Sequence, residues 1–180
     1  MISSFFSYLL IPAFTLFLAR DASLFSTNFS SFCGQPGRRL EFLLWCLVTG
    51  GYFCFSLRTL MRTFYNSRFS VLPAAGTLLY LISALLPYRP TSAPLLSLLH
   101  VVGSFCASVL LLLCLYLLAF RLCRKSPRRG MRCLLELAAA SLFCIIAWSL
   151  TGIINTAMEI CLIITASLQI PQFSLSSDSL

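Results

Sequence analysis

Two ionisable side chains, His100 and Glu159, lie inside long apolar runs of this 180-residue sequence. An acid and an imidazole held close together can transfer a proton or hold a polar ligand. Placing an ionisable group inside a membrane span is costly, so each such group needs a partner or a function. We therefore take both as the first candidates for chemistry. Two purely structural alternatives stay open: the two side chains form a buried pair, or Glu159 reaches the membrane interface and contacts Arg89.

The elements that position these residues follow from the composition. The chain is 59% hydrophobic and only 10% charged, whereas a soluble domain carries roughly 25% charged residues. Much of its apolar surface must therefore face lipid. We expect an all-α fold, a polytopic membrane helix bundle of about six transmembrane helices, in a single domain over 1–173 with a Ser-rich tail over 174–180. The expected helices cover residues 2–18, 42–57, 71–86, 95–120, 134–150 and 153–170.

The last apolar stretch, 133–170, decides the helix count. As one helix it would be about 57 Å long, nearly twice the ~30 Å hydrocarbon thickness of a bilayer. We expect two helices with a turn over 149–152, and an end at Pro171. The alternative is five spans with one bent last helix. At the other end of the chain, residues 1–22 lack a basic region, which favours an uncleaved helix over a signal peptide.

The basic residues indicate an orientation. The net charge is +8, and the basic segments 58–68 and 121–132 should lie in the cytoplasm, because membrane proteins keep Lys and Arg on that side. The segments 19–41 and 87–94 and the turn at Thr151 then lie outside or in a lumen, and both termini are cytoplasmic, although Arg38 and Arg39 in the first outer segment count against this. Since no basic face with interleaved aromatic residues exists outside the spans, we expect no nucleic-acid partner.

The faces of the helices suggest where a ligand would bind. At ~1.5 Å per residue, His100 and Glu159 both lie roughly 8–9 Å below the same outer surface. Stripes of small and polar residues at spacings of three and four on 71–86, 95–120 and 153–170 should face one another. We expect an outer-leaflet polar pocket there. Its candidate ligand-binding residues are His100, Glu159, Ser97, Ser104, Asn155, Tyr80 and Ser83.

Other residues could contact lipid headgroups or neighbouring side chains. Interfacial arginines often contact lipid phosphates, and Arg58, Arg62 and Arg89 are the candidates. Arg132 and Glu136 are four residues apart, which predicts an ion pair along one helix. Nine cysteines occur, mostly in apolar runs where cysteine behaves as a small hydrophobe.

Soluble-type catalytic motifs are absent from the sequence. There is no CxxC pair, zinc-type Cys/His spacing, phosphate-binding loop or HExxH motif, so we expect no metal and no cofactor. His100 and Cys106 suggest a Cys–His peptidase, but six residues turn a helix by about 600° and place the two side chains some 120° apart. Cys33, in the first outer segment, has no obvious disulfide partner. We name no catalytic residue and lean against an enzyme.

Two segments resemble a known family. The run Ala93–His100, continuing through residue 120, resembles the fourth helix of the DRAM/FRAG-type six-helix membrane proteins, in which a loop proline precedes a helix with an outer histidine. The run Asn155–Ile160 is similar to the last helix of that family, where a glutamate follows small residues. Bacterial six-helix relatives of unknown function share the histidine pattern. The resemblance implies a role in lipid remodelling, lipid organisation or autophagy.

We therefore expect a multi-pass integral membrane protein with a lipid-related binding or organising role. A small-solute transporter or transporter subunit is the alternative, and an intramembrane lipid-modifying enzyme is the least expected. The expected partners are a membrane lipid and another membrane protein. The location would be the plasma membrane in a bacterium, or an endomembrane or the plasma membrane in a eukaryote.

Overall fold

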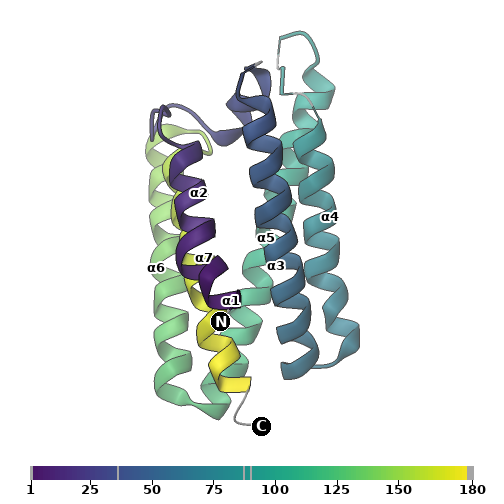
Figure 1. The fold of residues 1–180 in the computed structure, drawn as a ribbon. Coiled ribbons are helices and arrows are strands. Elements are labelled where there is room, and N and C mark those ends of the chain that lie inside the picture. Colours follow the sequence, from purple (N-terminus) through teal and green to yellow (C-terminus); the bar gives the residue numbers. More distant parts are fainter. Residues whose placement is uncertain (1, 36, 87, 90, 178–180) are drawn as a thin grey trace.

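The structure of the chain, a computed structural model, describes residues 2–35, 37–86, 88–89 and 91–177, and this part is all-α, without a strand (Figure 1). Long runs rich in leucine favour helices, which satisfy their backbone polar groups internally. In chain order the elements are α1 (Ile2–Phe5), the π-helical turn η1 (Phe6–Leu10), α2 (Ile11–Leu18), the 3₁₀ helix η2 (Phe29–Gly34), α3 (Arg39–Phe64), the 3₁₀ helix η3 (Ser67–Ser70), α4 (Val71–Leu85), α5 (Pro94–Lys125), α6 (Pro127–Thr151) and α7 (Thr156–Ser177).

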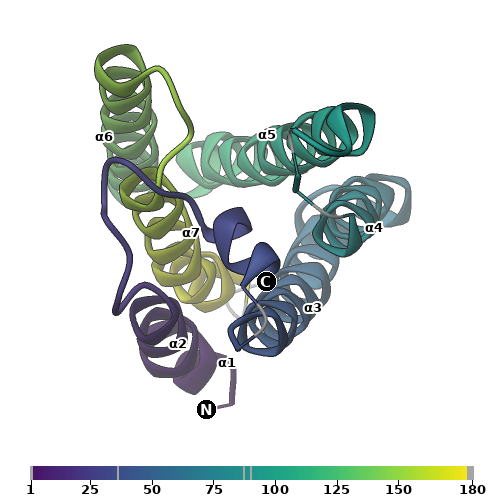
Figure 2. The same cartoon turned by 90° about the horizontal axis from the view of Figure 1, so that it is seen from above.

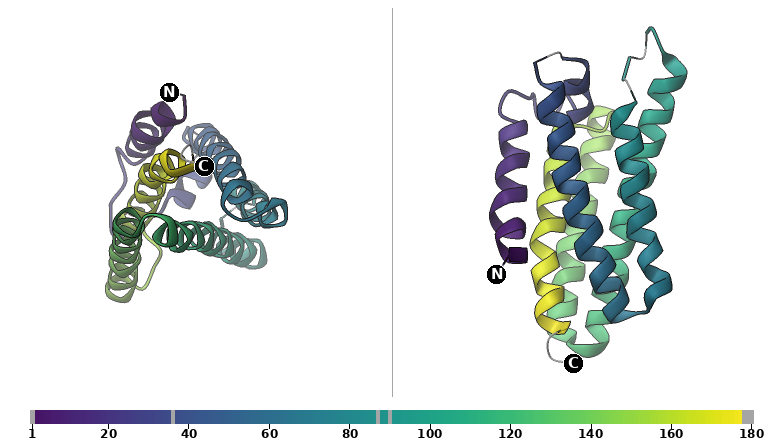
Figure 3. Two further views of the ribbon diagram at one scale, coloured as in Figure 1. Left: turned by 90° about the horizontal axis from the view of Figure 1, so that it is seen from below. Right: turned by 45° about the vertical axis from the view of Figure 1, so that its right-hand side comes forward.

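The helices run up and down alternately, so that the connections gather at two ends of the bundle (Figures 1 and 3). One end, which we call the cap end, carries the connections over residues 19–38, 86–93 and 152–155. The other, which we call the basic end, carries η3 and the short α5–α6 turn at Ser126. The start of α1 and the end of α7 both point toward the basic end (Figure 3).

Five of the helical segments are long and apolar enough to cross a membrane: α3, η3 with α4, α5, α6 and α7. The N-terminal segment Phe6–Leu18 is a shorter apolar helix. Large apolar side chains also cover the outside of the bundle; Leu150 is 81% and Phe55 is 76% exposed. Such a surface is unsuited to water and matches a lipid environment.

The split of the last apolar stretch is confirmed. Gly152 has a positive φ of 71° and ends α6, as glycine commonly does at a helix C-terminus. The alternative of one bent helix over 133–170 is therefore wrong. The expected end at Pro171 is also wrong, because α7 continues to Ser177 with Pro171 inside it. Ile170 and Phe173, on either side of the proline, are buried, and their packing compensates for the backbone hydrogen bond that proline removes.

Two expected loops turn out to be largely helical. α3 extends to Phe64, so Arg58 and Arg62 lie in its last turns and not in a loop. No glycine or proline interrupts the chain there, and arginine and leucine both favour a helix. In the basic segment 121–132, only Ser126 separates α5 from α6. Most of the basic residues therefore project from the ends of rigid helices.

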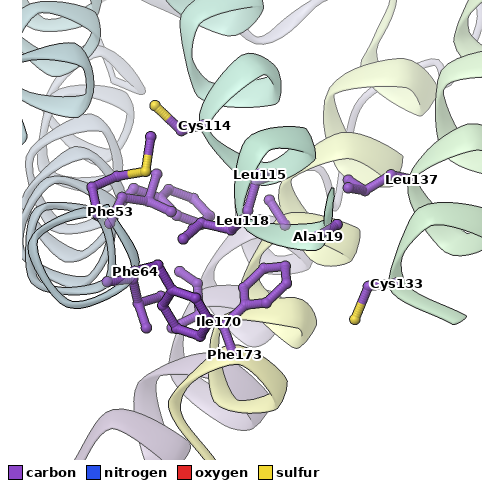
Figure 4. Close-up of a cluster of buried hydrophobic side chains, with 14 of the residues drawn as sticks. Phe53, Phe64, Cys114, Leu115, Leu118, Ala119, Cys133, Leu137, Ile170 and Phe173 are labelled. Atoms are coloured by element: carbon purple, nitrogen blue, oxygen red, sulfur yellow. The ribbon is translucent and has the colours of Figure 1, made fainter. Parts of the chain in front are cut away.

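The largest core lies toward the basic end. It joins side chains of α3, α5, α6 and α7, among them Phe64, Leu118, Leu137 and Phe173, all at most 3% exposed (Figure 4). α5 and α6 approach closely at Gly130, where a Cβ would overlap the backbone of Cys123. A second, mainly aromatic core lies at the cap end; its buried members are Leu18, Ala19, Phe29, Phe32, Phe42, Trp45, Cys46 and Ala84.

Candidate functional site

A folded segment covers the cap end of the bundle. We call residues 24–34 the cap; they contain η2, which lies over the end of the bundle between α3 and α7 (Figure 2). Phe29 and Phe32 anchor it and are only 1% and 3% exposed. The ring of Phe29 packs edge-on against Trp45 of α3, with 4.9 Å between ring centres. Asn28 begins η2, because its side chain accepts a hydrogen bond from the backbone N–H of Ser31 (3.0 Å).

His100 ties the cap to two helices. The residue is 2% exposed, and its Nδ1 lies 2.6 Å from the backbone oxygen of Ser83 on α4. Its Nε2 lies 2.7 Å from the hydroxyl of Ser30 in the cap. A carbonyl can only accept, so Nδ1 carries a proton, and in the neutral ring Nε2 accepts from Ser30. Both ring nitrogens are thus occupied by the protein itself.

Glu159 holds the neighbouring residue of the cap. Its Oε2 accepts a hydrogen bond of 2.7 Å from the backbone N–H of Phe29. Within the described residues, no ion pair joins Glu159 to His100 or to Arg89. The two candidate groups therefore meet the cap at adjacent residues, Phe29 and Ser30, instead of bonding to each other. Glu159 lies in the first turn of α7, so this bond joins the start of that helix to the cap.

The first turn of α7 makes further bonds to the cap. The first backbone N–H groups of a helix have no acceptor inside it. Here the N–H of Thr156 donates to the carbonyl of Thr27 (2.7 Å), and the N–H of Ala157 donates to the carbonyl of Leu24 (2.9 Å). Asn155 is a capping residue, since its Oδ1 accepts from the N–H of Met158 at 3.1 Å. Thus the cap and α7 form one hydrogen-bonded unit.

Two further candidate pocket residues, Ser97 and Ser83, also bond within the protein. Ser97 accepts from the backbone N–H of Arg89 (2.8 Å) and donates to the carbonyl of Ala93 (3.0 Å). The hydroxyl of Ser83 donates to the carbonyl of Leu79 in its own helix. Ser104 is only partly buried. The expected polar pocket is therefore filled by the cap and its bonds.

A cavity of about 90 Å³ does lie deeper in the bundle, between α3, α4, α5 and α7. We call it the hydroxyl cavity. Of the seven candidate ligand-binding residues, all of which the structure describes, only Tyr80 lines it. Gly50 and Gly76 shape its wall: a Cβ at Gly50 would lie 3.3 Å from the Tyr80 ring. The full lining is Thr49, Gly50, Phe53, Leu57, Pro73, Gly76, Thr77, Tyr80, Ala107, Ser108, Leu111 and Ile163.

The hydroxyl groups of two residues that line this cavity stand out. The Oγ1 of Thr49 and the phenol oxygen of Tyr80 are buried, and neither has a hydrogen-bond partner of good geometry in the described part of the chain. The Tyr80 hydroxyl lies beside the thiol of Cys46 and within electrostatic reach of Glu159. A buried hydroxyl without a partner costs roughly 1–3 kcal/mol. Two such groups on residues that line one mainly apolar cavity suit a ligand that carries a polar atom.

Sequence reasoning missed Thr49. A signal was present, because Thr49, Gly50 and Gly51 form a run of small residues in the middle of an otherwise bulky apolar helix. Small residues in a membrane helix often mark a close contact with a neighbouring helix. The contact here is with the ring of Tyr80.

The candidate headgroup arginines lie at different ends. Arg58 and Arg62 project from the last turns of α3 at the basic end, whereas Arg89 lies in the α4–α5 connection at the cap end. None of their side chains is in an ion pair within the described residues. Contact with lipid phosphates stays a prediction for all three. The ion pair between Arg132 and Glu136 is confirmed, at 2.8 Å.

The described residues offer no group of three or more His, Cys, Asp or Glu side chains that could hold a metal ion. The eight cysteines whose side chains the structure describes form no disulfide. The side chain of Cys33 lies outside the described part of the chain, so its lack of a disulfide partner stays a prediction.

Comparison with known proteins assigns no family: the chain matches no protein-family model, no curated protein and no solved structure. The resemblance to the DRAM/FRAG-type proteins therefore stays a prediction, and we infer the function from the geometry of the cap and the hydroxyl cavity.

Proposed function

We propose that the chain is a multi-pass integral membrane protein that binds part of an uncharged lipid in the hydroxyl cavity. The observation that carries this proposal is the pair of buried hydroxyls of Thr49 and Tyr80, two residues that line a mainly apolar cavity; among the described residues neither hydroxyl has a hydrogen-bond partner of good geometry. A carbonyl or hydroxyl group on the ligand would satisfy both, and the apolar remainder of the lipid would contact the surrounding side chains.

The size and depth of the cavity favour a lipid group over a whole solute. A cavity of about 90 Å³ has room for about three groups of the size of a water molecule. Thr49 lies ten residues into α3, about 15 Å from the start of the helix. This depth lies within the hydrocarbon core of a bilayer, which uncharged lipids can enter but from which charged solutes are excluded.

The route of entry also favours a lipid. The cap covers one end of the bundle, and His100 and Glu159 hold it in place. Ser108 lines the cavity yet is exposed on the surface of α5. A mouth beside Ser108 would open sideways, toward the bilayer. The cavity lining includes no charged residue, which makes transport of a polar solute the weaker candidate.

The broader setting is part of the same proposal. The lipid role agrees with what the DRAM/FRAG-type resemblance implies, and the up-and-down order of the helices is compatible with both termini on one side. The arginine-rich basic end would then face the cytoplasm, and the cap end would face the outside or a lumen. In this setting His100 and Glu159 act as structural groups that keep water out of the cap end.

The test removes each hydroxyl without changing the shape of its side chain. Thr49→Val and Tyr80→Phe should each lower the fraction of protein that retains a neutral lipid in native mass spectrometry, by about fivefold for one lost hydrogen bond. Each change should also stabilise the lipid-free protein against heat, because an unpartnered buried hydroxyl is removed. Thr63→Val is the matched control, since Thr63 is exposed and bonds within its own helix.

Opposite effects on lipid retention and on stability are the signature of a ligand site. If both variants became more stable but retained the same lipid as the wild type, the proposal would be wrong. Flux of a polar solute into vesicles that stops with Tyr80→Phe would support the transporter instead. Turnover of an added lipid would support the enzyme.

A further inference from the structure

A second hollow lies on the side of the bundle, in the half toward the basic end. It is a groove of about 870 Å³ between α6 and α7, with Tyr8 of η1 on its far side. α7 lies between α6 and the N-terminal helix in the views from both ends (Figures 2 and 3). The groove is lined by Tyr8, Arg129, Arg132, Glu136, Ala139, Ala140, Cys161, Thr165, Leu168, Gln172 and Leu175.

We propose that this groove, which we call the arginine groove, binds an anionic phospholipid. The phosphate would lie at Arg129 and Arg132, and an acyl chain would extend past Ala139 and Ala140. The site is separate from the hydroxyl cavity, because the two share no lining residue. This inference therefore stands or falls independently of the proposed function, apart from the shared premise that the bundle lies in a membrane.

The length of the groove fits one leaflet of a bilayer. Its lining on α6 extends from Arg129 to Ala140, which is about 16 Å along a helix. The hydrocarbon core of a bilayer is ~30 Å thick, so one leaflet contributes about 15 Å. The polar end of the groove coincides with the basic end of the bundle, where the lipid headgroups of that leaflet would lie.

The charges at the polar end are suited to a phosphate. Arg129 is exposed and has no carboxylate partner within the described residues. Arg132 pairs with Glu136, yet its side chain is 74% exposed, so that part of its guanidinium stays open to a second acceptor. Glu136 also accepts a hydrogen bond of 3.5 Å from the side-chain N–H of Gln172. With one carboxylate and two guanidinium groups, this end keeps a net positive charge.

The other end of the groove is suited to an acyl chain. Ala139, Ala140, Cys161 and Thr165 have small side chains, which leave space between α6 and α7, and Leu168 adds an apolar wall. A second copy of this chain is the competing occupant. It would bring its own arginines to the same end of the bundle in a parallel arrangement, and like charges in contact oppose association. The charge pattern therefore favours the anionic lipid.

The experiment titrates the purified full chain, in mild detergent, with phosphatidylglycerol or with phosphatidylcholine of identical acyl chains, and native mass spectrometry measures the bound lipid. We expect phosphatidylglycerol to bind more tightly than phosphatidylcholine. Arg129→Gln and Arg132→Gln should each weaken the binding of phosphatidylglycerol by about fivefold. Arg128→Gln is the matched control, because Arg128 is an exposed arginine of the same helix turn that does not line the groove. Glycerol phosphate, which lacks acyl chains, should not displace the lipid.

A second pair of variants tests the acyl end without touching a charge. Ala140→Leu would fill the groove and should abolish binding of both lipids, whereas Ala138→Leu, on the exposed face of α6 outside the groove, should change nothing. Equal losses from Arg128→Gln and Arg129→Gln, or equal binding of the two lipids, would overturn the inference. A dimer lost with Ala140→Leu would point to the second copy. Thermal unfolding of each variant separates misfolding from lost binding.

Discussion

The two ends of this bundle are held together by different forces. At the cap end, short polar contacts join the cap to the helices: His100, Glu159 and Asn155 each bond to a backbone or side-chain group of another segment or of a helix terminus. Ion pairs of Arg20 and Arg38 with Glu41 close the same end. At the basic end, the core is apolar and closely packed, and most arginines have no carboxylate partner among the described residues.

This difference separates groups that the protein uses for itself from groups that it leaves available. The polar groups of the cap end form hydrogen bonds with the cap, although their spacing in the sequence predicted a ligand site. Among the described residues, the exposed arginines without a carboxylate partner at the basic end and the hydroxyls of Thr49 and Tyr80 have no such use in the fold. Stability should therefore respond to volume changes at the basic end and to hydrogen-bond changes at the cap end.

The largest effect should come from added volume at the basic end. Gly130→Ala would place a Cβ on the backbone N and Cα of Cys123, which cannot rotate away as a side chain could. We expect a loss of about 3 kcal/mol in the free energy of unfolding, the upper part of the range for overpacking. Denaturant titration in mixed micelles, followed by circular dichroism, measures it.

The matched control is the same substitution at a glycine with open space. A Cβ at Gly51 would meet nothing within 4 Å, and alanine favours a helix over glycine, so Gly51→Ala should stabilise the protein by up to about 1 kcal/mol. Similar losses for both variants would mean that the α5–α6 contact at Gly130 does not limit stability.

A smaller effect is expected from the loss of two hydrogen bonds at the cap end. His100→Ala removes the bonds to the Ser83 carbonyl and the Ser30 hydroxyl. Two lost bonds should cost about 2 kcal/mol. Because the cap would also loosen, trypsin should cleave more quickly at Arg20, next to the cap, and gel electrophoresis of the fragments measures this rate.

Ser149→Ala is the control for the cap experiment, because the Ser149 hydroxyl is exposed and bonds only within α6. It should leave both stability and cleavage unchanged. Cleavage at Arg20 that did not change with His100→Ala would show that the imidazole does not hold the cap.

The sequence predicted most of the fold for a physical reason. Apolar runs separated by charge, glycine or proline force a chain to form membrane-length helices, and the turn at Gly152 followed from the length of the stretch 133–170. It failed at Pro171 and at Arg62, where helices continue past the expected ends. Packing of Phe173 into the core outweighs the local preference of a proline, and no local pattern contains that tertiary contact.

The candidate site was predicted only in part. The expected equal depth of His100 and Glu159 below one surface agrees with their position at one end of the bundle. This depth could be predicted because the rise per residue of an α-helix is fixed. The cap between them could not be foreseen, since residues 24–34 form an irregular segment whose position depends on the burial of Phe29 and Phe32. The hydroxyl cavity depends on the contact between Gly50 of α3 and the ring of Tyr80 of α4. The pattern of residues along one helix does not show which residues of another helix will lie against it.

The smallest effect tests whether Glu159 is a structural acceptor or handles protons. Glu159→Gln keeps an oxygen that can accept from the N–H of Phe29, so stability and lipid retention should match the wild type. Glu159→Leu leaves that buried N–H without its acceptor, which costs roughly 1–3 kcal/mol. Removing a carboxylate from an apolar site offsets part of this cost, so that a net loss of about 1 kcal/mol is expected in the same titration. A glutamine variant that folds normally but loses function would instead identify a proton-handling role, because only the carboxylate exchanges a proton.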